Sequence, residues 1–272
     1  MLLGFGVALL DNKRLAKSKT KSSTDLGSSI TSLRKAFSLL NAVAASSQSL
    51  TIAEASAAAG ISRPTGYRIV EALIAEGHLS QDSSGRLHVG FASLPLAAKV
   101  LDTNRLRMDA LPALQDLSKS TGRRSNLGVL YRGRILHIVG AEKPSLPIRY
   151  ARFGKIVPLH CSAMGKALLA YLPEDQVKML IDNQGMNAYT TNTITTYKAF
   201  MKDLEKVRTN GFSVSNQEHV AGLFAVAAVV RDGSGPIASI GLLGRSLPSV
   251  VAMADKVIHT AEIVSHCMDR AE

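Results

Sequence analysis

The segment from residue 61 to residue 90 places the strongest constraint on how this chain can fold. After Ser62, apolar residues recur at helical spacing, and Pro64 falls in the first turn, where amides have no intrahelical acceptor. Gly77 ends this helix, and two short alternating stretches follow around an Asp-Ser-Ser-Gly turn, which is the signal for a hairpin. The segment therefore predicts a helix followed at once by a hairpin.

Two more helices are predicted before this segment. Apolar residues at helical spacing favour a first helix over residues 32–45. Thr51 is the expected N-cap of a second helix over about residues 52–59, because Glu54 follows at capping-box spacing, and Gly60 ends it. Helix, helix, tight glycine turn, helix and hairpin is the order of a winged helix-turn-helix, expected over residues 30–91. The third helix can then enter a major groove, and Arg86 in the hairpin can contact DNA.

Charge and composition agree with a polyanionic partner but do not locate its site. The formal net charge of the 272 residues is +11, and the excess of Lys and Arg is spread over the whole chain. Trp is absent and aromatic residues make up 5%, so a stacking platform for single-stranded nucleic acid is disfavoured. A double-stranded DNA partner fits these numbers better.

Cysteine content and the N-terminus indicate the compartment. Two cysteines, Cys161 and Cys267, form no disulfide framework and indicate a reducing cytoplasm. The apolar run at the start is too short to span a bilayer, and its basic residues follow it, unlike those of a signal peptide. Residues 1–29 are expected to be a disordered basic tail, and no membrane partner is expected.

The rest of the chain predicts a linker helix over residues 92–108 and a domain over 109–272, with a break or a new helix start at Pro112. Strands and helices alternate from Arg124, and a short Asp-Gly-Ser-Gly turn favours antiparallel strands, so the fold class is α+β. Strands are expected over residues 125–131, 135–141, 146–152, 211–215, 223–230 and 237–244. Helices are expected over 162–172, 174–184, 197–210 and 249–268.

Two other classes of protein remain open at this point. An enzyme on the α+β half would need a catalytic group, but His160, Cys161 and Ser162 are adjacent in a turn and point in different directions, so no catalytic residue and no cofactor is expected. His259 and His266 are too far apart to chelate a metal, and none is expected. A scaffold whose winged helix binds protein is the other alternative.

Several segments together resemble the IclR family of bacterial transcriptional regulators, from about Ile30 to the C-terminus. They are LTIAEASAAAGISRPTGYRIVEAL, PLHCSAMGKALLAYL, TTNTIT, LEKVRTNGF, and EHVAGLFAVAAVV followed by GSGPIASIGLLG. The resemblance implies a winged helix-turn-helix, a linker helix and an effector-binding domain similar to GAF and PAS folds, with an antiparallel sheet flanked by helices. It also implies a homodimer or dimer of dimers on a pseudo-palindromic operator that senses a small carboxylate or aromatic metabolite.

The resemblance and the residue chemistry together predict the DNA contacts. Thr65, Tyr67 and Arg68 match the family's run at the start of the recognition helix, whereas Pro64 replaces its usual Ser. Thr65 suits a phosphate contact, Tyr67 a phosphate or a thymine methyl group, and Arg68 a phosphate or guanine. Thr51 would contact phosphate at the N-terminus of its helix. The expected DNA-binding residues are Thr51, Ser62, Arg63, Thr65, Tyr67, Arg68 and, in the wing, Arg86.

The effector site is expected where HCSAMGK opens a helix, because free amides there suit a carboxylate. The residues expected to bind the effector are Ser162, Ala163, Met164, Ser215, Glu218, Ala225, Gly241 and Leu243. Family positions that often carry Asp, Cys, Ser and Ser are here Ser215, Ala225, Gly241 and Leu243. A less polar site predicts an aromatic or otherwise bulky carboxylate, since unpaired polar groups in a closed site cost roughly 1 to 3 kcal/mol each.

Overall fold

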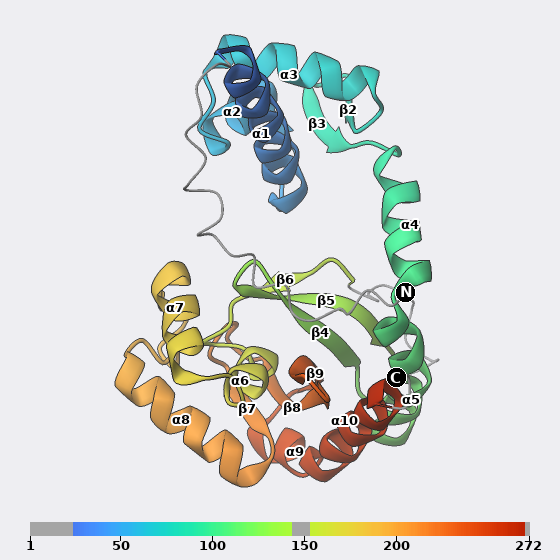
Figure 1. The fold of residues 1–272 in the computed structure, drawn as a ribbon, viewed down its shortest axis with the longest axis vertical. Helices are drawn as coiled ribbons and strands as arrows, with labels where there is room; N and C mark the ends of the chain where they lie inside the picture. The colour runs from blue at the N-terminus through green and yellow to red at the C-terminus, as the bar shows by residue number, and fades with distance from the viewer. Residues whose placement is uncertain (1–23, 143–152, 270–272) are drawn as a thin grey trace. The chain divides into compact units, whose positions relative to one another are not determined.

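The computed structural model describes residues 24–142 and 153–269 (Figure 1). The chain divides between Thr103 and Asn104 into two compact units. The first unit holds the predicted helices and hairpin. The second holds the predicted α+β region.

The first unit contains three helices and a small sheet. Its helices are α1 (Thr24–Ala45), α2 (Ile52–Ala58) and α3 (Arg63–Ala75). The strands β1 (Leu50–Thr51), β2 (Leu79–Gln81) and β3 (Arg86–Val89) form an antiparallel sheet in the order β1-β3-β2. The winged helix-turn-helix arrangement is confirmed, with β1 as a strand that was not predicted. Because α1 begins at Thr24, the predicted tail is wrong for residues 24–29, and residues 1–23 lie outside the described part.

Helices α2 and α3 cross closely because two small residues face each other. A Cβ atom at Gly66 would lie 1.9 Å from Ser56 Oγ and 2.9 Å from Ser56 Cβ, so only glycine allows this approach. Ser56 is fully buried and its hydroxyl donates to the Ile52 carbonyl, 2.6 Å away. Aliphatic residues from the helices and the hairpin complete the core: Leu39, Val43, Ala55, Ile61, Val70, Leu79 and Leu87.

The predicted linker helix ends earlier than the sequence indicated. Helix α4 covers Ser93–Thr103, and α5 (Arg105–Thr121) belongs to the second unit. Asn104 separates them because it leaves the helical conformation and its side chain accepts the Arg107 amide at 2.8 Å, which caps α5. The predicted break at Pro112 is wrong: this proline lies inside α5, on its exposed side, where water can bond the carbonyl that loses its partner.

The second unit is built on one antiparallel sheet of six strands in the order β6-β5-β4-β9-β8-β7. The strands are β4 (Ser125–Tyr131), β5 (Arg134–Ala141), β6 (Ile156–Val157), β7 (Ser213–Asn216), β8 (Phe224–Asp232) and β9 (Gly235–Gly244). The Asp232 side chain accepts the Ser234 amide in the predicted turn between β8 and β9. Strand β7 pairs only with residues 224–227 of β8, and the Arg231 amide farther along β8 donates to Ser265 Oγ at 3.0 Å. The predicted strand over 146–152 lies outside the described residues.

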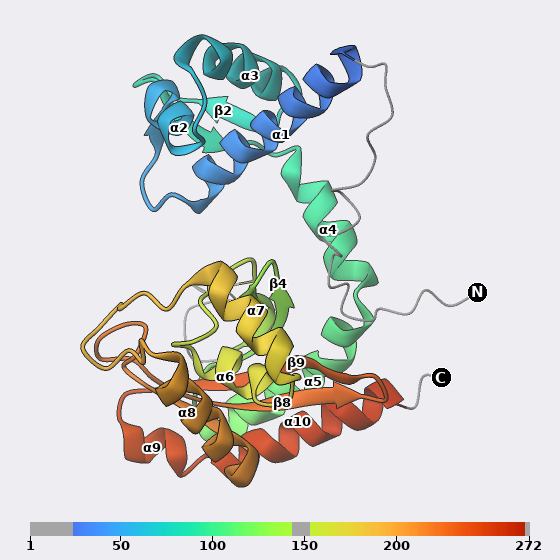
Figure 2. The ribbon, with the colours of Figure 1, turned by 60° about the vertical axis from the view of Figure 1, so that its left-hand side comes forward.

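Helices cover both faces of the sheet (Figure 2). On one face α5 packs with α9 (Leu247–Val251) and α10 (Ala254–Asp269), and on the other face lie α6 (Ala163–Leu169), α7 (Glu174–Gln184) and α8 (Tyr197–Asn210). The single C-terminal helix predicted over 249–268 is wrong, because α9 ends at Val251 and a separate helix, α10, begins at Ala254. No glycine or proline marks that break in the sequence. Helix α6 is also shorter than the predicted 162–172.

Candidate functional site

The exposed side of α3 carries the basic and aromatic side chains that the sequence assigned to DNA. Arg63 and Arg68 are exposed and make no ion pair with any described residue, and Tyr67 is 50% exposed. Ser62 occupies the N-cap position but bonds the Thr65 hydroxyl at 2.9 Å instead of a backbone amide. Gly66 and Val70 are the buried residues of α3, whereas Arg63, Tyr67 and Arg68 are accessible to solvent.

Thr51 begins α2 in the predicted capping box. Its hydroxyl accepts the Glu54 amide at 3.3 Å, and its own amide donates to the Glu54 carboxylate at 2.7 Å. These backbone and side-chain bonds to Thr51 lower the pKa of Glu54. The carboxylate beside Thr51 means that a phosphate there must approach through the first-turn amides of α2.

Arg86 is tied to the body of the unit. Its Nη1 donates to the Ser49 carbonyl at 2.6 Å and lies 4.0 Å from the Glu54 carboxylate, although about half of its side chain is exposed. The wing turn carries Asp82, whose pKa is lowered by hydrogen bonds, first from His88 at 2.9 Å and then from Ser84. The turn itself has no basic side chain, and Arg86 lies next to the segment that connects α1 to α2.

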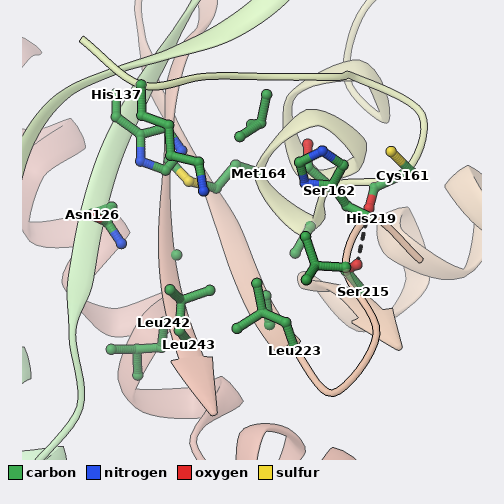
Figure 3. A pocket seen from close by; sticks show the side chains of 16 residues that line it. Asn126, His137, Cys161, Ser162, Met164, Ser215, His219, Leu223, Leu242 and Leu243 are labelled. Carbon is green, nitrogen blue, oxygen red and sulfur yellow. Dashed lines mark hydrogen bonds between the residues drawn. The ribbon is translucent and has the colours of Figure 1, made fainter. Parts of the chain in front are cut away.

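A cavity of about 70 Å³ lies between α6 and the sheet of the second unit (Figure 3). Its lining residues come from all six strands, β4 to β9, from the start of α6 and from the loop before β8. They are Asn126, His137, Lys155, Val157, Cys161, Ser162, Ala163, Met164, Ser215, His219, Val220, Leu223, Ala225, Gly241, Leu242 and Leu243. Segments up to 117 residues apart in the sequence, from Asn126 to Leu243, thus form one enclosure.

The two ends of the cavity differ in polarity. Figure 3 shows His137 and Asn126 at one end, and Leu223, Leu242 and Leu243 at the other. Lys155 adds a positive charge to the lining and, after burial, is the next cause that lowers the pKa of His219. The positive charge of Lys155 favours an anionic group in a partly apolar ligand.

The start of α6 adds hydrogen-bond donors to the wall. Ser162 caps the helix: its hydroxyl accepts the Gly165 amide at 3.1 Å and donates to the Pro158 carbonyl at 2.6 Å. The amides of Ala163 and Met164 have no acceptor among the described residues. A Cβ at Gly165 would lie 2.2 Å from the Leu159 carbonyl oxygen, so glycine permits this tight entry into the helix.

A buried ion cluster fixes the far side of α6. Lys166 is 1% exposed, and its ammonium lies 2.7 Å from Glu218 Oε1 and 2.9 Å from Asp203 Oδ2. Burial raises the pKa of Glu218, and the Lys166 charge opposes that rise. The Glu218 carbonyl also accepts the Thr193 hydroxyl at 2.6 Å. The cluster joins α6, α8 and the loop that carries His219, Val220 and Leu223 into the cavity.

Both parts of the chain match models of one protein family. Residues 32–83 match the IclR helix-turn-helix domain, and residues 98–267, more than half of the chain, match the C-terminal domain of the bacterial transcriptional regulator IclR. The glycerol operon regulatory protein of Streptomyces coelicolor is 30% identical over 79% of this chain and 85% of its own length. The chain belongs to the IclR family.

Solved structures of IclR proteins have the same fold. An IclR transcriptional regulator from Alicyclobacillus acidocaldarius matches with a TM-score of 0.75 and 27% identity, over 87% of this chain and 98% of that one. An IclR homologue from Microbacterium hydrocarbonoxydans, complexed with 4-hydroxybenzoate, matches with a TM-score of 0.72 and 20% identity, over 89% and 100%. The protein is thus a transcriptional regulator with a helix-turn-helix domain and an effector-binding domain, and its family is not enzymatic.

The structure brings together most of the residues that the sequence assigned to the effector. Ser162, Ala163, Met164, Ser215, Ala225, Gly241 and Leu243 all line the cavity. Glu218 does not, because its carboxylate is bound to Lys166. The Ser215 hydroxyl donates to the Cys161 carbonyl at 2.9 Å, as the dashed line in Figure 3 shows. The sequence reasoning missed Asn126, His137 and Lys155, since they lie on strands and loops that only the tertiary fold brings to α6.

Metal and membrane features are absent from the described ranges, 24–142 and 153–269. No group of three or more His, Cys, Asp or Glu side chains there is placed to hold a metal ion. None of the helices in these ranges is long and apolar enough to cross a membrane. His259 instead lies 4.0 Å from Glu262 on the exposed side of α10.

Cys161 of this IclR protein is expected to resist alkylation in the folded state. Its side chain is fully buried, and burial raises its pKa to about 12, so at pH 8 only about one thiol in ten thousand is ionised. Iodoacetamide should therefore add once to the native protein, at the half-buried Cys267, and twice after denaturation. Intact-protein mass spectrometry measures both. Equal rates at the two cysteines in folded protein would contradict the burial of Cys161.

Proposed function

We propose that this regulator binds a pseudo-palindromic DNA operator as a homodimer or dimer of dimers and responds to a small carboxylate with an aromatic or otherwise bulky apolar body. The cavity beside α6 carries the effector part of this proposal. Lys155 and the unpaired amides of Ala163 and Met164 supply positive charge and donors for a carboxylate. Leu223 and Leu243 supply an apolar wall that a small polar acid would not fill.

The DNA part of the proposal assigns α3 to the major groove. Arg63 and Arg68 would contact phosphate or guanine, Thr65 phosphate, and Tyr67 phosphate or a thymine methyl group. Ser62 and Thr51 would contact phosphate at the starts of their helices, and Arg86 would contact the backbone beside the wing. The exposure of the α3 side chains supports this assignment.

Exposed apolar side chains in the first unit support a homodimer. Ile30, Leu33 and Phe37 recur along α1, and a second set lies on and just before α4: Phe91, Leu94, Leu96 and Val100. Monomeric proteins rarely leave so many large apolar residues exposed in one small domain. A second copy of the chain would cover them and would place two α3 helices for a two-fold symmetric operator.

The domain assignment that we propose follows the division of the chain into units. A DNA-binding domain would end near residue 91, α4 would link it to the effector domain, and the effector domain would begin near α5. The effector would act by binding one arrangement of the paired DNA-binding domains more tightly than another, since a ligand shifts an equilibrium only by its differential affinity. We propose the cytoplasm as the compartment, where such a protein meets DNA.

One experiment tests the DNA and effector proposals together. The purified chain is titrated into labelled duplex from the DNA that flanks its own coding region, over a range of salt concentrations and with a panel of carboxylates. We expect specific binding whose log affinity falls linearly with log salt, as counterion release requires, and a shift in that affinity with aromatic acids. Binding to protein alone without any salt-dependent DNA binding would support the scaffold alternative. Tight binding of glyoxylate or pyruvate, with none of aromatic acids, would refute the effector class.

A further inference from the structure

A row of small residues lies under the side chain of Met164, on the sheet face toward α6. Gly128 on β4 pairs with Ser239 on β9, and Asn126 pairs with Gly241 in the same two strands. A Cβ atom at Gly128 would lie 2.7 Å from Met164 Cε, and one at Gly241 would lie 2.9 Å from Met164 Cγ. The methionine therefore occupies space that the two glycines leave open, and it lines the cavity at the same time.

Next to this methionine lies a polar atom that the fold does not use. Ser239 is fully buried, and its hydroxyl has no hydrogen-bond partner among the described residues. Directly paired residues on one face of a sheet are neighbours, so Ser239 lies beside Gly128, where the end of the Met164 side chain rests. A buried hydroxyl without a partner is unfavourable, and a ligand group that reached it would remove that cost.

Methionine is suited to be displaced by a ligand. Its side chain is unbranched and has three rotatable bonds, so it adapts to the shape of what it contacts. Movement of the Met164 side chain away from Gly128 would lengthen the cavity toward Ser239. The positions on β9 nearer the cavity, Gly241 and Leu243, offer no hydroxyl. Ser239 does not line the present cavity. It is the β9 residue that would offer a hydroxyl to a ligand if the end of the Met164 side chain moved away from Gly128.

We propose that Met164 sets the depth of the effector cavity, and that the Ser239 hydroxyl beneath it binds a hydroxyl group at the end of the effector opposite its carboxylate. This inference rests on the proposed aromatic carboxylate and narrows it to hydroxylated members of that class. Met164 acts as a specificity residue: a ligand without the distal hydroxyl leaves the methionine in place, and a ligand with it displaces the side chain.

The test compares benzoate and 4-hydroxybenzoate by calorimetry on the full chain and on three variants, Met164→Ala, Ser239→Ala and the double variant. Met179→Ala, an exposed methionine on α7, is the matched control. Met164→Ala should raise the affinity for 4-hydroxybenzoate over benzoate by about 5- to 10-fold, the effect of one hydrogen bond that no longer competes with a side chain. Ser239→Ala should lower that preference in both backgrounds and leave benzoate unchanged.

The outcomes separate this inference from the proposed function. If both acids bind and their affinity ratio is the same in all variants, the assignment of Met164 and Ser239 is wrong while the aromatic-carboxylate site stands. If neither acid binds any variant at millimolar concentration, the effector class is wrong and this inference falls with it. Ser239→Ala removes only an unpartnered hydroxyl and is expected to fold, so the comparison with the original chain decides the matter even if Met164→Ala does not fold.

Discussion

Replacing Lys166 by alanine is expected to lower the free energy of unfolding by about 3 to 5 kcal/mol, the usual cost of removing one partner from a buried ion pair. The variant would leave Glu218 and Asp203 facing the space of a deleted ammonium, with Glu218 almost fully buried. Denaturant unfolding followed by circular dichroism measures the change. The loss should grow as pH rises from 5 to 7, because an unpaired buried carboxyl has a raised pKa and is increasingly ionised over that range.

Lys178→Ala is the matched control for this prediction. Lys178 also pairs with a carboxylate, Asp182, at 2.9 Å, but both side chains are 61% exposed on α7. Its removal should change stability by no more than the error of the measurement. Equal losses in the two variants would mean that the buried cluster has no special role in stability. A Lys166→Ala loss that did not vary with pH would argue that packing, and not charge, is responsible.

Replacing Arg68 by alanine is expected to weaken operator binding by roughly 1 to 3 kcal/mol, or about 5- to 150-fold, if the guanidinium contacts a guanine bidentately. Arg68 is exposed on α3 and makes no ion pair with a described residue, so its removal should not affect folding. Fluorescence anisotropy with labelled operator, together with thermal unfolding of the free protein, measures both effects.

Two further variants sharpen the interpretation of Arg68. Arg245→Ala removes the same charge from an exposed position after β9 and should leave DNA affinity nearly unchanged. Arg68→Lys keeps the charge but loses the forked donor geometry, so it should retain the salt dependence and lose discrimination between operator and random DNA. If Arg68→Ala binds as tightly as the unaltered chain, Arg68 lies on a solvated helix face and does not contact DNA.

The local elements of the fold could be predicted because their signals are local. The capping box at Thr51, the glycine that ends α2 and the alternating residues of β5 each act over a few neighbouring positions. The break between α9 and α10 could not be predicted, since no breaking residue marks it and tertiary packing decides it. The same holds for Pro112, which a helix with an exposed face accommodates.

The site divides in the same way. Residues near the start of α6 were predictable because the local sequence indicates where a helix starts, and the first amides of a helix have no intrahelical acceptor. Asn126, His137 and Lys155 were not, because their approach to α6 depends on how β4 and β5 pair with the rest of the sheet. Lys166 was missed for a different reason: a lysine within an apolar helix is normally placed in solvent, and its two acid partners lie 37 and 52 residues away.

The outer half of β8 has a consequence for how copies of this protein can associate. Strand β7 covers only residues 224–227, yet the Arg231 amide beyond them is already bonded to Ser265, and the Arg231 side chain lies over the Tyr171 ring. An incoming strand would find a donor occupied and a charged group in its path. Growth of the sheet by addition of a strand from another copy is thereby discouraged at this edge.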